Sequence, residues 1–286
     1  MDWFTDLRRF ADRAALRVRA ARWYRGGRVP GTPGHGSAKW LAILDGIGAR
    51  GPKPIGYDDG ALDERVVEYA WAFERVAQHA GARQVLDAGS VLNHRRILDC
   101  WRAAGLPPVS IVTLAHEGYA EVSDDVRYAF ADLRRLPWRD QSFDIVLSLS
   151  TLEHVGLDNR AYGGAGGHAP DPGAEAVAAL RELQRVTRAG GTLLLSVPFG
   201  ARSNRGWFRI FDREDLERLM SVPGWRSNAP RIFRAGPEGW RETSLDAAAD
   251  AGYNEPLGHG SRTAPAWVAA AEAVALVEFT RTAGAR

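Results

Sequence analysis

An acidic residue and a glycine follow a short apolar segment near the end of the first third of the chain. Asp87 and Gly89 come directly after Val85 and Leu86, and residues 94–104 then show helical spacing. This order is typical of the first strand, turn and helix of a nucleotide-binding α/β domain, which binds its ligand at the carboxyl end of the strand. Glycine allows a tight turn and a close approach of the ligand, and a carboxylate such as Asp87 can order that turn. Many buried strands that bind nothing end in the same way.

Four further motifs follow in a fixed order and make the first turn more informative. They are Asp132-Leu133-x-x-Leu136-Pro137, Phe143-Asp144-x-Val146, Leu152-Glu153-His154 and Gly190-Gly191-x-Leu193-Leu194-Leu195. Together with the turn they resemble class I S-adenosylmethionine-dependent methyltransferases over roughly residues 62–282. The combined order is far more specific than any one of the motifs.

The resemblance implies S-adenosylmethionine as the cofactor and assigns several residues to it. Asp87, Gly89 and the turn lie on the methionine and ribose side, Asp132 and Leu133 at the adenine, and Ser150 at the methionine portion.

Two departures from the family pattern affect the expected cofactor site. Val91 and Asn93 stand where the family has its second and third turn glycines, and Thr113 stands where an acidic residue normally holds the ribose. Ser90 and Asn93 can still supply side-chain hydrogen bonds. Glu117, one helical turn after Thr113, is predicted to take the ribose role from a shifted position.

Methyl transfer needs in-line alignment of the reacting groups and at most a base that removes the acceptor's proton. Glu153 and His154 follow the strand end, and a histidine with a pKa near neutrality can serve as that base. The Glu-His pair also recurs in the family as a helix-start element. A second candidate, His168, lies in the glycine-rich segment Gly156 to Pro172. That segment is interpreted as a lid over the substrate, with a flexible insertion as the alternative.

The leading function is methyl transfer to a small-molecule acceptor. A sugar or natural-product intermediate is suggested because the Gly-Ser-x-Leu-Asn-His turn resembles that of bacterial methyltransferases associated with glycan and secondary-metabolite pathways. The alternative is a non-catalytic or repurposed domain that has lost donor binding. An NAD-dependent enzyme is disfavoured because the turn lacks the Gly-x-Gly-x-x-Gly pattern.

The alternation of strands and helices predicts an α/β fold of Rossmann-like, doubly wound type. We expect a seven-stranded, mostly parallel sheet with an antiparallel last strand and an N-terminal helical extension. The expected strands are at about 84–88, 109–114, 126–130, 143–149, 192–197, 230–234 and 272–281, and the expected helices at 63–79, 94–104, 174–188 and 211–219.

The N-terminal segment, residues 1–57, is set apart from the methyltransferase domain expected over 58–286. An amphipathic, arginine-rich helix is predicted from Trp3 to about Tyr24. Gly/Pro-rich connectors without regular structure are expected at 26–37 and 49–60, with a short apolar piece at 39–47 between them. Residues 1–25 are expected to contact the domain or a partner protein, with an anionic membrane surface or an anionic substrate carrier as the alternative.

Composition limits the remaining classes. The chain has 286 residues, 45% of them hydrophobic and 25% charged, and a net charge of +2, with residues 1–60 carrying a net +5. This gives little support to nucleic-acid binding. A single cysteine, Cys100, excludes an internal disulfide, no Cys/His spacing indicates a metal site, and no apolar run reaches the length of a membrane span. The expected location is cytoplasmic.

Overall fold

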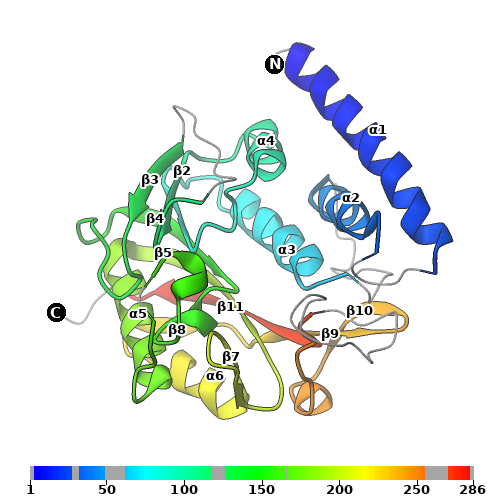
Figure 1. Cartoon of the computed structure of the whole chain (residues 1–286). Helices are drawn as coiled ribbons and strands as arrows, with labels where there is room; N and C mark the ends of the chain where they lie inside the picture. The colour runs from blue at the N-terminus through cyan, green and yellow to red at the C-terminus, as the bar shows by residue number, and fades with distance from the viewer. Residues whose placement is uncertain are drawn as a thin grey trace.

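The computed structural model describes residues 3–27, 32–48, 62–117, 126–164, 166–254 and 270–283. A central sheet of nine strands has the order β10-β9-β11-β5-β4-β1-β2-β3, with β8 beside β11 (Figure 1). The strands are β1 (Val85–Ala88), β2 (Val109–Thr113), β3 (Val126–Phe130), β4 (Phe143–Leu149), β5 (Thr187–Pro198), β8 (Trp225–Ser227), β9 (Arg231–Gly236), β10 (Gly239–Thr243) and β11 (Ala273–Arg281). From β3 to β5 the pairing is parallel.

Helices cover both faces of this sheet, as the doubly wound fold predicts (Figure 1). One face carries α3 (Arg65–Gln78) and α4 (Arg95–Ala103), with α2 (His35–Gly48) and α1 (Trp3–Arg25) packed outside them. The other carries α5 (Pro172–Val186) and α6 (Arg213–Met220), and Asp212 caps α6 by accepting from the backbone N–H of Asp215. Because side chains alternate along a strand, Val85 packs in the hydrophobic core between the sheet and α3, and Leu86 packs in the core between the sheet and α5.

The sheet has more strands than the predicted seven. The predicted strands near 230–234 and 272–281 are confirmed as β9 and β11, and β11 runs antiparallel to both β5 and β9. The extra strand β10 pairs with β9 through a tight connection after Gly236. Its Trp240 is fully buried and donates from its indole N–H to the carbonyl of Leu62 at 2.9 Å. β8 has only three residues, and β10 begins with a glycine and contains two charged residues, so neither shows a clear strand pattern in the sequence.

The predicted end of the helix at 174–188 is wrong by two residues, and the following strand begins earlier than expected. Helix α5 ends at Val186, and Thr187 already pairs with Phe143 as the first residue of β5. The register shifts between Phe143 and Ile145, and Gly190 at φ 75° accommodates the irregular backbone. The helical spacing of this sequence therefore continues past the point at which strand pairing takes over.

The connector predicted at 26–37 is partly helical, because α2 begins at His35 and extends through the expected apolar piece. Ala38 and the run from Leu41 to Leu44 are buried, and this burial outweighs the poor helix propensity of the glycines in α2. The second connector, 49–60, and the boundary at 57/58 lie outside the described residues.

The predicted N-terminal helix is confirmed as α1. Leu16, Ala20 and Trp23, all in its second half, are buried in the core that α2 shares. Phe10 and Val18 are exposed, with 70% and 75% of their surface accessible. No helix within the described part of the chain is long and apolar enough to cross a membrane.

Candidate active site

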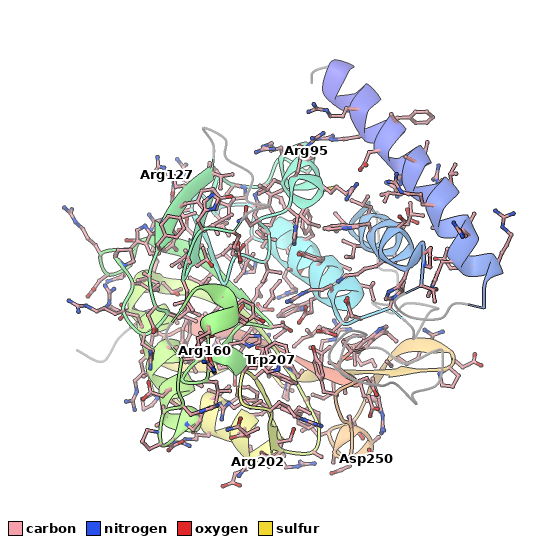
Figure 2. All side chains as sticks on the ribbon, in the orientation of Figure 1. Arg95, Arg127, Arg160, Arg202, Trp207 and Asp250 are labelled. Carbon is pink, nitrogen blue, oxygen red and sulfur yellow. The ribbon has the colours of Figure 1, made fainter. Side chains whose placement is uncertain are left out.

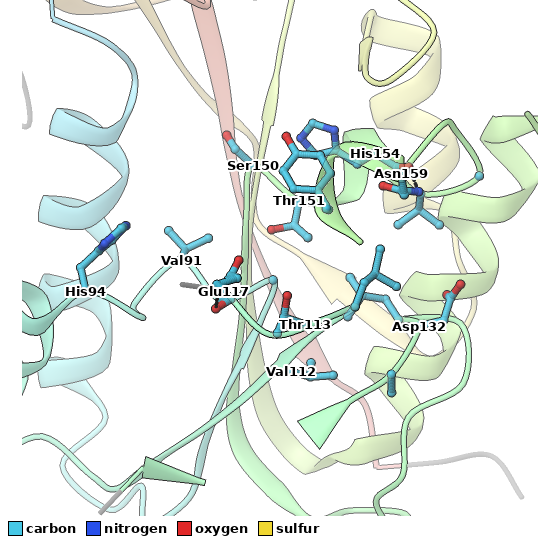
Figure 3. A pocket seen from close by; sticks show the side chains of 18 of the residues that line it. Val91, His94, Val112, Thr113, Glu117, Asp132, Ser150, Thr151, His154 and Asn159 are labelled. Atoms are coloured by element: carbon cyan, nitrogen blue, oxygen red, sulfur yellow. Dashed lines mark hydrogen bonds between the residues drawn. The ribbon is translucent and has the colours of Figure 1, made fainter. Parts of the chain in front are cut away.

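A cavity of about 210 Å³ opens at the carboxyl edge of the sheet, where the parallel strands β1, β2 and β4 end. Figure 3 shows Thr113, Glu117 and Asp132 on one side of it, and Ser150, Thr151 and His154 on the other. Six of the predicted cofactor residues line it: Gly89, Ser90, Glu117, Asp132, Leu133 and Ser150. Most of the residues predicted to bind the cofactor therefore line a single cavity.

Asp87 lies behind this cavity and does not line it. Its carboxylate is fully buried and accepts the backbone N–H of Leu92 at 2.7 Å, so it orders the turn after β1. Burial raises the pKa of Asp87 to about 7. The turn itself needs positive φ at Gly89 (135°) and Ser90 (63°).

Asn93, at one of the two positions where the family has a glycine, belongs to a hydrogen-bonded group with Ser90, Glu117 and Tyr128. The Asn93 side-chain amide donates to Ser90 Oγ at 2.9 Å and to Glu117 Oε2 at 3.0 Å, and Ser90 Oγ donates to the same carboxylate oxygen. The hydroxyl of Tyr128 on β3 donates to Asn93 Oδ1. Asn93 is fully buried outside the cavity, so its described contacts orient Glu117, which lies in the cavity.

Asp132 and Leu133 lie just beyond β3, on the side of the cavity opposite Ser150. Asp132 accepts from the backbone N–H and from Nε of Arg134 at 2.8 and 2.9 Å, and the hydrogen bonds from the Arg134 side chain hold the pKa of Asp132 below its usual value. Leu133 is 7% exposed and presents an apolar surface to the cavity.

Helix α3 supplies a charged residue that the sequence did not single out. Arg65 lines the cavity and donates to the fully buried carboxylate of Glu68 at 2.6 Å. The hydroxyls of Ser150 and Ser196 donate to the other oxygen of Glu68, at 2.5 and 2.6 Å. The network thus fixes Ser150, the predicted methionine-side residue, at the end of β4. The available signal was Glu68, a charged residue among the apolar residues Val66, Val67, Tyr69 and Trp71 of α3.

His154 lines the cavity from the short helix η1 (Leu152–His154) after β4. Its Nδ1 lies 2.8 Å from the carbonyl oxygen of Trp207, so Nδ1 carries the hydrogen and Nε2 keeps a lone pair. The imidazole stacks on Trp207 with ring centroids 5.4 Å apart and meets Tyr162 edge-on at 5.0 Å. Burial lowers the pKa of His154 to about 4, so the ring is neutral at pH 7.

The other two predicted catalytic residues do not line the cavity. Glu153 is buried, and burial raises its pKa well above the usual value. Its Oε1 lies 3.9 Å from Nε2 of His154, which is beyond hydrogen-bond distance. His168 is exposed in the segment after β4. In that segment, Ala169 donates its backbone N–H to the carbonyl of Gly156 at 2.8 Å.

Comparison with known proteins agrees with this architecture. Residues 108–195 match the family model described as a methyltransferase domain. A malonyl-[acyl-carrier protein] O-methyltransferase of Geobacter sulfurreducens is 29% identical over 180 residues, which cover 58% of this chain and 64% of that protein. The matched region therefore spans less than two thirds of this relative.

The solved structures that resemble this chain are more distant in sequence. A Burkholderia thailandensis 1,6-didemethyltoxoflavin-N1-methyltransferase, solved with S-adenosylhomocysteine, is 15% identical with a TM-score of 0.45, over 73% of this chain and 76% of that one. A putative methyltransferase of Bacillus halodurans is 14% identical with a TM-score of 0.46, over 73% and 96%.

The sheet order and the cavity at its carboxyl edge define a Rossmann-like ligand-binding domain. Within that class, residues 108–195, which run from β2 into β5, match the model of a methyltransferase domain. This match agrees with a fold of the class I S-adenosylmethionine-dependent type, for which S-adenosylmethionine is the cofactor.

Proposed function

We propose that the chain transfers a methyl group from S-adenosylmethionine to a small-molecule acceptor. The observation that carries the proposal is the neutral His154, whose Nε2 lone pair is available in the same cavity as six of the predicted cofactor residues. A sugar or natural-product intermediate is the acceptor class suggested by resemblance of the first turn. The curated relative named above acts, by its name, on a malonyl group held by an acyl carrier protein.

The cavity's donors and acceptors fit the chemical groups of this cofactor. Arg65 offers a cation for a carboxylate, Glu117 an acceptor for ribose hydroxyls, and Leu133 an apolar surface for a purine ring. Asp132 offers a carboxylate near the adenine side, where it accepts N–H donors in the same way that it accepts those of Arg134. When bound, the cofactor supplies an electrophilic methyl group, and the chain's own residues orient the reactants and take up the acceptor's proton.

Calorimetric titration with S-adenosylmethionine and with its demethylated product tests the donor site. We expect dissociation constants in the micromolar range, of the order that a buried, polar cofactor cavity supports. A folded protein that binds neither compound would favour the alternative, a domain that keeps the fold and has lost its donor. This alternative is tested directly because Val91 and Asn93 replace two glycines of the family's cofactor-binding turn.

His154→Ala should lower the turnover rate about a hundredfold while donor affinity changes little. This is the lower end of the usual contribution of a general base, because a pKa near 4 makes the imidazole a weak base. The neutral form predominates above that pKa, so the rate should stay level from pH 8 to about 5 and fall only as the pH approaches 4.

His168→Ala is the matched variant, because His168 lies outside the cavity in the same loop region. Initial rates and donor dissociation constants of both variants separate the two histidines. A large rate loss in His168→Ala with a normal rate in His154→Ala would assign the base to the loop and exclude His154.

A further inference from the structure

A second, larger cavity of about 530 Å³ lies between α1, α2 and α4. His94, just before α4, lines both this cavity and the candidate active site. The ring of Trp40 on α2 meets the ring of His94 edge-on with centroids 5.3 Å apart. These two rings form part of the wall between the cavities, so a group bound in the second cavity lies beside the first.

The second cavity is strongly basic. Five arginines line it, Arg8, Arg9 and Arg13 from α1 and Arg95 and Arg96 from α4, against two aspartates. The formal charge of the lining is therefore +3. Figure 2 shows Arg95 on α4, on the side toward the first half of α1. Neighbouring guanidinium groups of this kind bind phosphate oxygens through paired N–H donors.

Polar interactions hold the first half of α1 over this cavity, in contrast to the apolar packing of its second half. Arg9 donates to the backbone carbonyl of Asp99 at 2.5 Å, and Arg96 makes a two-pronged ion pair with Asp12 at 2.6 and 2.8 Å. The Arg13 guanidinium pairs with Asp45 through Nη2, whereas its Nε is buried and makes no hydrogen bond to any described residue. A buried donor of this kind indicates a polar occupant.

We propose that this cavity is a binding site for the phosphate or diphosphate group of a soluble small molecule. The guanidinium groups of α1 and α4 bind the phosphate oxygens from two sides. The indole of Trp40 offers a planar apolar surface for the remainder of the ligand. The site is chemically separate from the cofactor cavity, and His94 is their shared wall.

Calorimetry with inorganic pyrophosphate on the full chain tests the site, first with the wild type and then with Arg8→Ala/Arg95→Ala. Both arginines line the cavity and neither belongs to the candidate active site. We expect pyrophosphate to bind the wild type, and its affinity to fall about tenfold or more in this double variant. The control is Arg17→Ala/Arg139→Ala, which removes two exposed arginines outside the cavity and should leave the affinity unchanged.

Further titrations separate this site from the alternatives. Saturation with S-adenosylhomocysteine should leave pyrophosphate binding in place, and the double variant should bind S-adenosylhomocysteine as the wild type does. The proposal is overturned if pyrophosphate does not bind, if the control weakens binding equally, or if the cofactor product displaces pyrophosphate. It is also overturned if the double variant binds phosphatidylglycerol vesicles more weakly than the wild type does but binds pyrophosphate equally well. The arginines would then bind a lipid surface. Failure of the donor site appears independently, as absent S-adenosylhomocysteine binding in the wild type.

Discussion

Glu68→Ala should destabilise the folded chain by about 3–5 kcal/mol, the usual cost of removing one partner of a buried ion pair. Glu68 is fully buried and accepts from Arg65, Ser150 and Ser196 at once. Its loss leaves three donors without their acceptor, next to the cofactor cavity. Denaturant unfolding measures the change, and donor affinity should fall with it because Ser150 and Arg65 lose their positions.

The control is Glu74→Ala, on the same helix but exposed, where Glu74 accepts from the side chain of Gln78. It should change the free energy of unfolding by no more than about 0.5 kcal/mol. If Glu68→Ala unfolds as the control does, the network contributes nothing to the fold. A partial recovery in Arg65→Met/Glu68→Met would show that the lone charge of Arg65 causes most of the loss.

Gly89→Ala should weaken donor binding at least about a hundredfold, an effect of roughly 3 kcal/mol. A Cβ at this position would lie 2.0 Å from Oγ1 and 2.7 Å from Cβ of Thr151. Rotation of the Thr151 side chain cannot move its Cβ, so the turn or the start of η1 has to shift. Both segments line the cavity. Calorimetry with S-adenosylhomocysteine measures the loss.

Gly167→Ala separates backbone strain from the clash, because Gly167 also has positive φ (109°) but a Cβ there meets no atom within 4 Å. This variant should bind the donor normally. Equal donor affinities in Gly89→Ala and the wild type would show that the cavity is not the donor site. The sequence indicated only that Gly89 allows a close approach of the ligand, and the close approach of Thr151 makes some loss of stability part of the expected result.

Much of the fold is readable from the sequence where local signals are strong. β3 and β4 have the predicted bounds, Val126–Phe130 and Phe143–Leu149, because each is a short run of strand-forming residues bounded by polar or turn-forming residues. The prediction is wrong where tertiary contacts decide. α2 is helical despite its glycines because its apolar side chains are buried. Thr187 lies outside α5 because it pairs with Phe143 in the sheet.

The candidate site was predicted in outline, and its supporting contacts were not. The motifs locate Gly89, Asp132 and Ser150 because each follows a parallel strand, and such strand ends meet at one edge of a sheet. Arg65 is on a helix that precedes the first strand, and only the folded chain brings it to that edge. The contact between Gly89 and Thr151 likewise joins residues far apart in sequence.

The buried ionisable groups around the site also set how many protons the chain exchanges on folding. Burial raises the pKa of Glu64 and Asp87 to about 7 and that of Glu153 well above its usual value, so the native state holds extra protons above about pH 4.5. These carboxyls favour the fold most at low pH and less as the pH rises. His94 and His154, whose pKa values burial lowers to about 4, act in the opposite direction between pH 4 and 6.5. Over that interval the two histidines oppose the three carboxyls, so folding is coupled to the uptake of fewer protons than the carboxyls alone would take up.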